Sequence, residues 1–65
     1  MSGIGKNLRK RSKYLNLTDA EVARRIGISA RRYSYYVTDQ RQPDFAMLKK
    51  ICKVLRISYN ELFAE

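Results

Sequence analysis

Apolar residues recur at helical spacing along the whole chain, and no strand-like alternation is sustained anywhere in it. The clearest case is the set Leu48, Ile51, Cys52 and Leu55, which stand at positions i, i+3, i+4 and i+7 and define one apolar helix face. Similar signals predict helices over residues 4–15, 18–26, 29–37, 44–55 and 58–63. The sequence therefore predicts an all-α fold, built from five short helices joined by tight connections.

Local signals mark where these helices begin and end. Thr18 with Glu21, and Ser58 with Glu61, are capping boxes, in which the hydroxyl and the carboxylate each accept a hydrogen bond from the other residue's backbone amide. The polar stretch 38–43 contains the only proline and is predicted to be a loop. The other expected helix ends are marked by residues that suit caps and turns: Asn16, Gly27, Ser29 and Asp44.

Length and composition narrow the range of functions. Sixty-five residues suffice for one domain, which we expect to span residues 1–65, near the lower size limit for a core without cross-links. One cysteine and no histidine exclude an internal disulfide and an ordinary structural zinc site. With no histidine and six scattered carboxylates, no acid–base or metal constellation is visible. We therefore expect no enzyme activity, no cofactor, no metal and no small-molecule substrate.

The sequence also argues against a membrane protein and against an exported one. No run of about 18 apolar residues is present, which is the length needed to span a membrane. The start, Met-Ser-Gly-Ile-Gly, lacks the apolar segment of a signal peptide. The sequence therefore predicts a cytoplasmic protein that does not bind a membrane.

The net charge of +8 is concentrated in the first two thirds of the chain. Residues 1–42 carry ten Lys or Arg and three Asp or Glu, a net charge of +7, whereas residues 43–65 carry four and three, a net charge of +1. Clustered cations lower the cost of displacing counterions from phosphates, so this distribution favours a polyanion as partner. The alternative is a basic surface that is merely solvated.

The segment 18–37 reads as a helix, a turn containing Gly27, and a second helix. A short connection of this kind between two helices that share an apolar face is typical of a helix-turn-helix. Tyr33 and Tyr36 stand three residues apart and are predicted to pack in the core, which leaves Tyr35 as the tyrosine available for function. The expected inward residues are Val22, Ala23, Ile26, Ile28, Tyr33 and Tyr36.

Two stretches carry a recognisable motif. Residues 17–29 read L-T-D-A-E-V-A-R-R-I-G-I-S, and residues 43–63 end in L-R-I-S-Y-N-E-L-F. In this order they are similar to the patterns L-S-Q-x-E-L-A-x-x-L-G-V-S and L-x-x-I-A-x-x-L-x-V-S-x-D-x-L-F. The chain thus resembles the phage repressor/Cro-type (XRE-like) family of helix-turn-helix DNA-binding proteins, over about residues 4–63.

The resemblance implies a compact five-helix, lambda-repressor-like fold whose third helix lies in the major groove of double-stranded DNA. It places Ala30, Arg31 and Tyr35 at the base-reading positions, with Arg32 and Ser34 on their flanks. Their chemistry suits this role, because Arg31 can donate two hydrogen bonds to O6 and N7 of a guanine and Ala30 offers a methyl group to a thymine methyl. Tyr35 can pack against a base edge or hydrogen-bond to a base or a phosphate.

The resemblance also implies phosphate contacts from the start of the second helix and from the loop after the third. In this sequence those positions are Thr18, Gln40, Arg41 and Gln42. The first helix adds further candidates, of which Lys6 and Arg11 are the expected contacts. Which of its cations face DNA stays open among Lys6, Arg9, Lys10 and Arg11.

Asp19 departs from the family pattern, since it replaces the glutamine that reaches DNA at the start of the second helix. Its carboxylate suits the positive end of the helix dipole but is repelled by phosphate. Three interpretations stay open: the carboxylate accepts a hydrogen bond from a cytosine amino group, it orients Arg31, or it is simply a helix-terminal charge.

Two further departures concern backbone geometry and a missing ion pair. Asp39 and Arg56 stand where glycine usually ends the third and fourth helices, so we expect altered or slightly strained helix ends. Asp39 also places a negative charge in a loop expected near phosphate. Ser12 and Val37 replace an arginine and a glutamate that pair in many relatives, and because both are missing together no unpaired buried charge is expected.

These observations predict a sequence-specific DNA-binding transcriptional regulator. The expected protein is a Cro-like repressor that binds a palindromic operator as a weak homodimer. An antitoxin or other partner-binding module with the same fold is the alternative, and a non-specific RNA- or membrane-binding basic protein is a third that does not explain the motif. The expected dimer surface consists of Tyr59, Asn60, Glu61 and Phe63.

Overall fold

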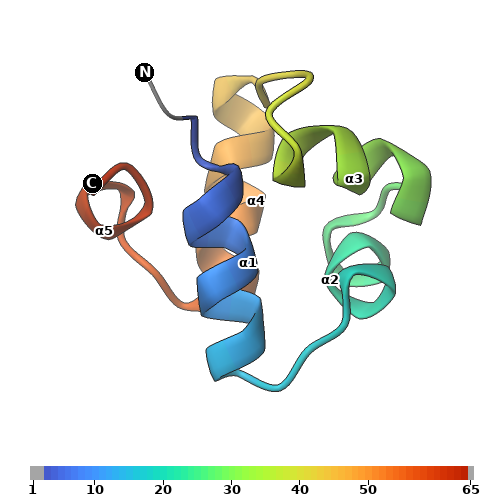
Figure 1. Cartoon of the computed structure of the whole chain (residues 1–65), viewed down its shortest axis with the longest axis horizontal. Coiled ribbons are helices and arrows are strands. Elements are labelled where there is room, and N and C mark those ends of the chain that lie inside the picture. The colour runs from blue at the N-terminus through green and yellow to red at the C-terminus, as the bar shows by residue number, and fades with distance from the viewer. Residues whose placement is uncertain (1–2, 65) are drawn as a thin grey trace.

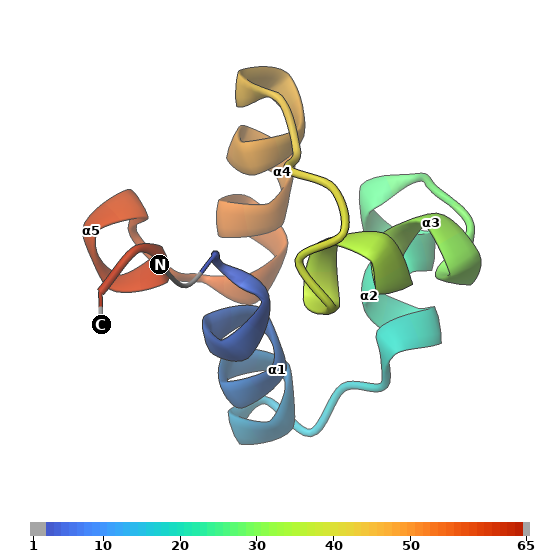
Figure 2. The same ribbon diagram turned by 45° about the horizontal axis from the view of Figure 1, so that its top comes forward.

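The computed structural model describes residues 3–64, which form five α-helices and contain no strand (Figure 1). The helices are α1 (Gly5–Tyr14), α2 (Asp19–Ile26), α3 (Ala30–Val37), α4 (Phe45–Leu55) and α5 (Tyr59–Leu62). Their order and positions confirm the predicted all-α, five-helix fold, with boundaries that differ by a residue or so. Figures 1 and 2 show α2 and α3 on one side of α1 and α4, and α5 on the other.

The core is a single cluster to which all five helices contribute. Tyr33, at 0% exposure, and Tyr36, at 5%, are both in it, which confirms their predicted core role. Leu48 and Cys52 of α4 pack against the cluster but remain partly exposed. The buried members are Ile4, Leu8, Val22, Ala23, Ile26, Tyr33, Tyr36, Val37, Ile51, Leu55 and Leu62.

One of the two predicted capping boxes is complete and the other is half formed. Ser58 Oγ accepts from the amide of Glu61 at 3.1 Å, and Glu61 Oε1 accepts from the amide of Ser58 at 3.3 Å. Thr18 Oγ1 accepts from the amide of Glu21 at 3.1 Å, but the return bond is not formed within the described residues. The Glu21 carboxylate instead lies 4.0 Å from Nη2 of Arg25, one helical turn further on, so the prediction of a full box at Thr18 was wrong.

Three residues other than glycine adopt the left-handed backbone at helix ends within residues 3–64: Asn16 (φ 59°), Asp39 (φ 61°) and Arg56 (φ 53°). For Arg56 this conformation is costly, by about 1 kcal/mol relative to glycine. Arg11 offsets the cost, since its Nε donates to the carbonyl of Leu55 and its Nη2 to that of Arg56, both at 2.8 Å. The departure from glycine at this helix end is therefore matched by a side-chain cap supplied from α1.

The start of α1 lies tightly against the end of α3. A Cβ on Gly5 would collide with the carbonyl oxygen of Val37, so only glycine permits this approach. The amide of Gly5 donates to Asp39 Oδ1 at 2.9 Å. The carboxylate of Asp39 thus supplies the N-terminal cap of α1, which has no side-chain cap of its own at Ile4.

The missing ion pair leaves no unpaired polar group at either of its two positions. Ser12 is 3% exposed and Val37 is 7% exposed. The hydroxyl of Ser12 donates to the carbonyl of Arg9 at 3.1 Å, so neither position buries an unpaired charge or an unpaired hydroxyl. The expectation drawn from the paired replacement is confirmed.

Candidate nucleic-acid interface

α2 and α3 form a unit whose connecting turn is held by three local features. Gly27 ends α2 in the left-handed conformation, with φ 87°. Ser29 then caps α3, because its Oγ accepts from the amide of Arg32 at 3.1 Å. Tyr33 and Tyr36 anchor the inner face of α3 in the core. The opposite face of α3 is therefore presented to solvent in a fixed orientation.

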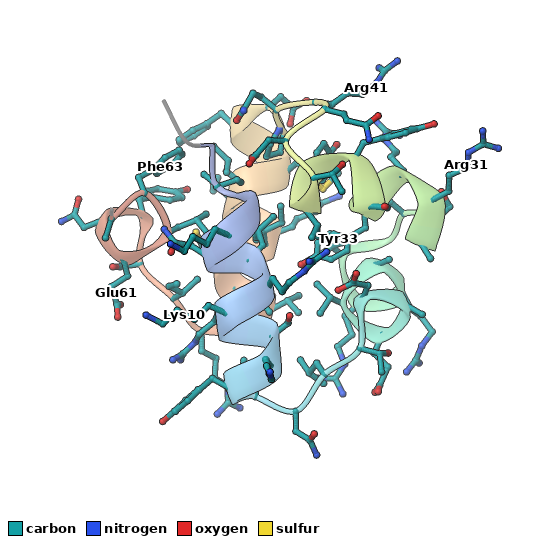
Figure 3. The ribbon with its side chains drawn as sticks, viewed as in Figure 1. Lys10, Arg31, Tyr33, Arg41, Glu61 and Phe63 are labelled. Carbon is teal, nitrogen blue, oxygen red and sulfur yellow. The ribbon has the colours of Figure 1, made fainter. Side chains whose placement is uncertain are left out.

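That outer face carries the residues expected to read bases. Ala30, Arg31, Arg32 and Ser34 are exposed, and Tyr35 is half-buried. Arg31 projects away from the body of the protein at the outer end of α3 (Figure 3). The structure thus brings the five predicted base-reading residues together on one helix.

The loop after α3 folds back onto Tyr35. The amides of Gln40 and Arg41 both donate to the carbonyl of Tyr35, at 2.9 and 3.1 Å. Cζ of Arg41 lies 5.7 Å from the centroid of the Tyr35 ring, a cation–π arrangement. The guanidinium points outward on the same side of the protein as Arg31 (Figure 3). Arg41, predicted to contact phosphate, and Tyr35, predicted to contact a base, therefore lie against each other.

A second group of candidates surrounds the N-terminal end of α2. Thr18 lines a shallow hollow of about 240 Å³ together with Arg9 and Lys13 of α1. Arg9 was one of four open alternatives in α1, whereas Lys13 was missed by the sequence interpretation. The two cations stand one helical turn apart, but Lys6 and Lys10 share that spacing, so no sequence signal singles this pair out. Gln42, the last predicted loop residue, is exposed.

The structure places Lys6 and Arg11 elsewhere. Both line a groove of about 650 Å³ between α1 and α5, together with Lys10. Two nitrogens of the Arg11 guanidinium are already bonded to carbonyls at the end of α4, and its Cζ lies 4.8 Å from the centroid of the Tyr14 ring. Figure 3 shows Lys10 on the side of α1 that faces α5, away from Arg31. These residues are not brought together with the outer face of α3.

Asp19, at the start of α2, lines the same hollow as Thr18, and its charge acts on a buried tyrosine. The hydroxyl of Tyr33 is buried and has no hydrogen-bond partner within residues 3–64. Burial, and after it the negative charge of Asp19, raise the pKa of Tyr33 well above its usual value. No ion pair joins Asp19 to Arg31 in the described part of the chain, so the interpretation that Asp19 orients Arg31 finds no contact to support it.

The predicted dimer residues lie on α5 and at its end, on the opposite side of the protein from α3 (Figure 1). Tyr59 is 39% exposed and Phe63 is 54% exposed. Phe45, at the start of α4, is 67% exposed, and its ring centroid lies 6.0 Å from that of Tyr59. The sequence did not mark Phe45 as part of this surface, because a single apolar residue in the first turn of a helix carries no distinguishing signal. Asn60 and Glu61 are exposed, and Glu61 also lines the groove between α1 and α5.

Other kinds of site find little support in the part of the chain that the structure describes. Within residues 3–64, no three His, Cys, Asp or Glu side chains come together in a way that could hold a metal ion. In the same range, no helix has the length and apolar character needed to cross a membrane. Cys52 is a free, half-buried thiol whose pKa is raised by burial.

α2 and α3 are joined by the turn at Gly27, and α3 presents its outer face to solvent with cations on its flanks. This arrangement is typical of a helix-turn-helix protein. Residues 6–62 match the helix-turn-helix family, and the chain belongs to that family. This membership supports a DNA-binding transcription regulator as the class of protein, and it confirms the resemblance found in the sequence.

A solved structure shows the same architecture. The chain is similar to the P22 c2 repressor protein, solved in complex with synthetic operator 9T in the presence of Tl+, with a TM-score of 0.88. The two share 23% sequence identity, and the similarity covers 98% of this chain and 97% of that one. The five-helix, lambda-repressor-like fold expected from the sequence is thereby confirmed. A search of curated proteins found no match.

Proposed function

We propose that this protein is a Cro-like repressor that binds a palindromic DNA operator as a dimer, with α3 in the major groove. The observation that carries the proposal is the outer face of α3, where five exposed or half-exposed side chains stand on a helix whose inner face is fully anchored. The structurally similar P22 c2 repressor was solved on a synthetic operator, and this supports the same mode of use here.

In this proposal, base recognition depends mainly on Arg31. Its guanidinium is exposed at the outer end of α3 and can donate two hydrogen bonds to O6 and N7 of a guanine. The exposed methyl group of Ala30 suits a thymine methyl. Tyr35 lies one further turn along the helix and contacts a base edge, while Arg32 and Ser34 contact the groove walls.

Phosphate contacts come from two places that flank α3. The loop after α3 contributes Gln40, Arg41 and Gln42, and the start of α2 contributes Thr18. Arg9 and Lys13, two cations that line the same hollow as Thr18, complete the second phosphate contact and outweigh the single carboxylate there, that of Asp19. Lys6 and Arg11 are not part of the proposed interface, because they line a groove on the α5 side.

Dimerisation is proposed through the exposed aromatic residues Phe45, Tyr59 and Phe63, together with Asn60 and Glu61. These rings stay accessible in the single chain, and their burial would remove apolar area from water. A second copy bound there would leave both α3 helices free. Twofold symmetry would then place the two helices on half-sites about one DNA turn apart.

The direct test is selection of bound fragments from random duplex DNA, followed by affinity measurements with variants. Arg31→Ala should weaken binding to the selected site by about 1–3 kcal/mol and relax the preference at one base pair. Arg24→Ala is the matched control, since Arg24 is an exposed arginine of α2 outside the proposed interface. Failure to enrich any sequence would overturn the proposal, and equal losses on selected and random DNA would overturn the role of Arg31.

A further inference from the structure

A second basic surface lies between the C-terminal halves of α2 and α4. It is a hollow of about 580 Å³ with four cations at its rim, Arg25, Lys50, Lys53 and Arg56. Its floor includes Ile26 and Val54. None of the lining residues belongs to α3 or to the loop after it. Gly27, in the turn before α3, also lines the hollow, but the hollow shares no residue with the surface proposed to read the operator.

The four cations are exposed and largely unpaired. Arg25 alone approaches a carboxylate in the described part of the chain, that of Glu21 at 4.0 Å. Among residues 3–64 no acidic side chain lines the hollow. α4 itself contains three lysines and no acidic residue, so Lys50 and Lys53 have no partner on their own helix. Mutual repulsion among these cations is relieved only by water, by ions or by a bound anion.

Helix dipoles account for part of this arrangement. Arg25 stands in the last turn of α2 and Lys53 in the last turn of α4, where a cation is favourable. Lys50 lies in the middle of α4, where the dipole provides no such benefit. The dipoles also give no reason for all four side chains to border the same hollow. Helix stability by itself therefore does not explain why the four cations are grouped.

The composition of the hollow indicates what it binds. In the described chain its lining combines cations with apolar residues and includes no neutral hydrogen-bonding side chain. Such a surface attracts negative charge without selecting a particular geometry, which suits a uniform row of backbone phosphates better than a defined peptide. We propose that this hollow binds the phosphate backbone of a second DNA duplex, independently of sequence, while α3 reads the operator.

The test is a bridging assay. An operator duplex found by selection is immobilised and saturated with protein, and a fluorescent duplex of random sequence is then added. Wild-type protein should retain the second duplex, and retention should fall steeply with salt. The double variant Lys50→Glu with Lys53→Glu should lose retention at least tenfold while operator affinity changes less than threefold.

The matched control is the double variant Lys6→Glu with Lys10→Glu, which makes the same change in net charge. Both lysines lie on α1, line the groove beside α5 and do not line the hollow. All four lysines are exposed, so circular dichroism should show every variant folded. The control should keep retention of the second duplex within threefold of wild type.

Three outcomes would overturn the inference: no retention by wild-type protein, equal losses in the two double variants, or Lys50- and Lys53-dependent binding of polyglutamate but not of duplex. The last result would assign the hollow to an acidic protein partner. Binding of the protein to the immobilised operator duplex is measured first, so a failure of the proposed repressor function is seen separately. If operator binding fails, binding of the random duplex is measured with the variant Arg31→Ala and Arg41→Ala. The same measurement is then made with Lys50→Glu and Lys53→Glu added to that variant.

Discussion

Asp39 combines two roles that a set of substitutions can separate. Its carboxylate accepts a hydrogen bond from the amide of Gly5 at 2.9 Å, and its backbone is left-handed, with φ 61°. A charge-assisted bond of this kind, in a partly buried place, contributes about 1–2 kcal/mol to the free energy of unfolding. The left-handed backbone costs alanine about 1 kcal/mol more than glycine or aspartate.

The substitutions should therefore rank in a defined order. Asp39→Ala loses the cap and adds backbone strain, so we expect a loss of about 2–3 kcal/mol. Asp39→Gly loses the cap but adds no backbone strain, and the net loss should be about 1–2 kcal/mol. Asp39→Asn keeps an acceptor oxygen and a residue that tolerates this backbone, and it should lose about 0.5 kcal/mol.

Urea denaturation followed by circular dichroism measures these differences, with thermal melts as a second observable. For a domain of this size, 1 kcal/mol shifts Tm by about 4–8 °C, so the alanine and glycine variants should be clearly resolved. Equal stability of Asp39→Ala and Asp39→Gly would refute the backbone argument. If Asp39→Ala matched wild type, the contact with Gly5 would contribute nothing to stability.

Three further predictions follow from particular contacts. Tyr33→Phe removes a buried hydroxyl without a partner in the described chain and should stabilise the protein by about 1 kcal/mol in a thermal melt. Because the folded-state pKa of Tyr33 is raised, wild-type stability should fall as pH rises above the unfolded value of about 10. Tyr33→Phe should reduce this loss of stability at alkaline pH. An unchanged pH profile of stability would contradict the role of the Tyr33 hydroxyl. Gly5→Ala should lower the free energy of unfolding in urea by about 1–3 kcal/mol, because the added Cβ would collide with the carbonyl oxygen of Val37. A stabilised variant would contradict the close approach of α1 to the end of α3. In a double-mutant cycle on DNA affinity, Tyr35→Leu and Arg41→Ala should be coupled by about 0.5–1 kcal/mol through their stacked contact, and simple additivity would show that the two act separately.

The sequence by itself was sufficient for the helices and for the core of the helix-turn-helix. Apolar spacing is a local property of each segment, and N-caps such as Ser29 and Asp44 act within one turn. For the same reason the burial of Tyr33 and Tyr36 followed from their spacing. The family resemblance added the expected outer face of α3, and the structure brings those residues together.

Only the tertiary structure decided which cations share a surface. Arg9 and Lys13 lie beside Thr18, whereas Lys6 and Arg11, from the same helix, lie towards α5. α1 carries several lysines and arginines of similar chemistry, and their spacing in the sequence does not show which neighbouring helix each will face. Contacts between distant segments decide that, as do the caps that Asp39 and Arg11 supply to other helices, across 34 and 44 positions of sequence. Such contacts depend on how the helices pack, and no local pattern encodes them.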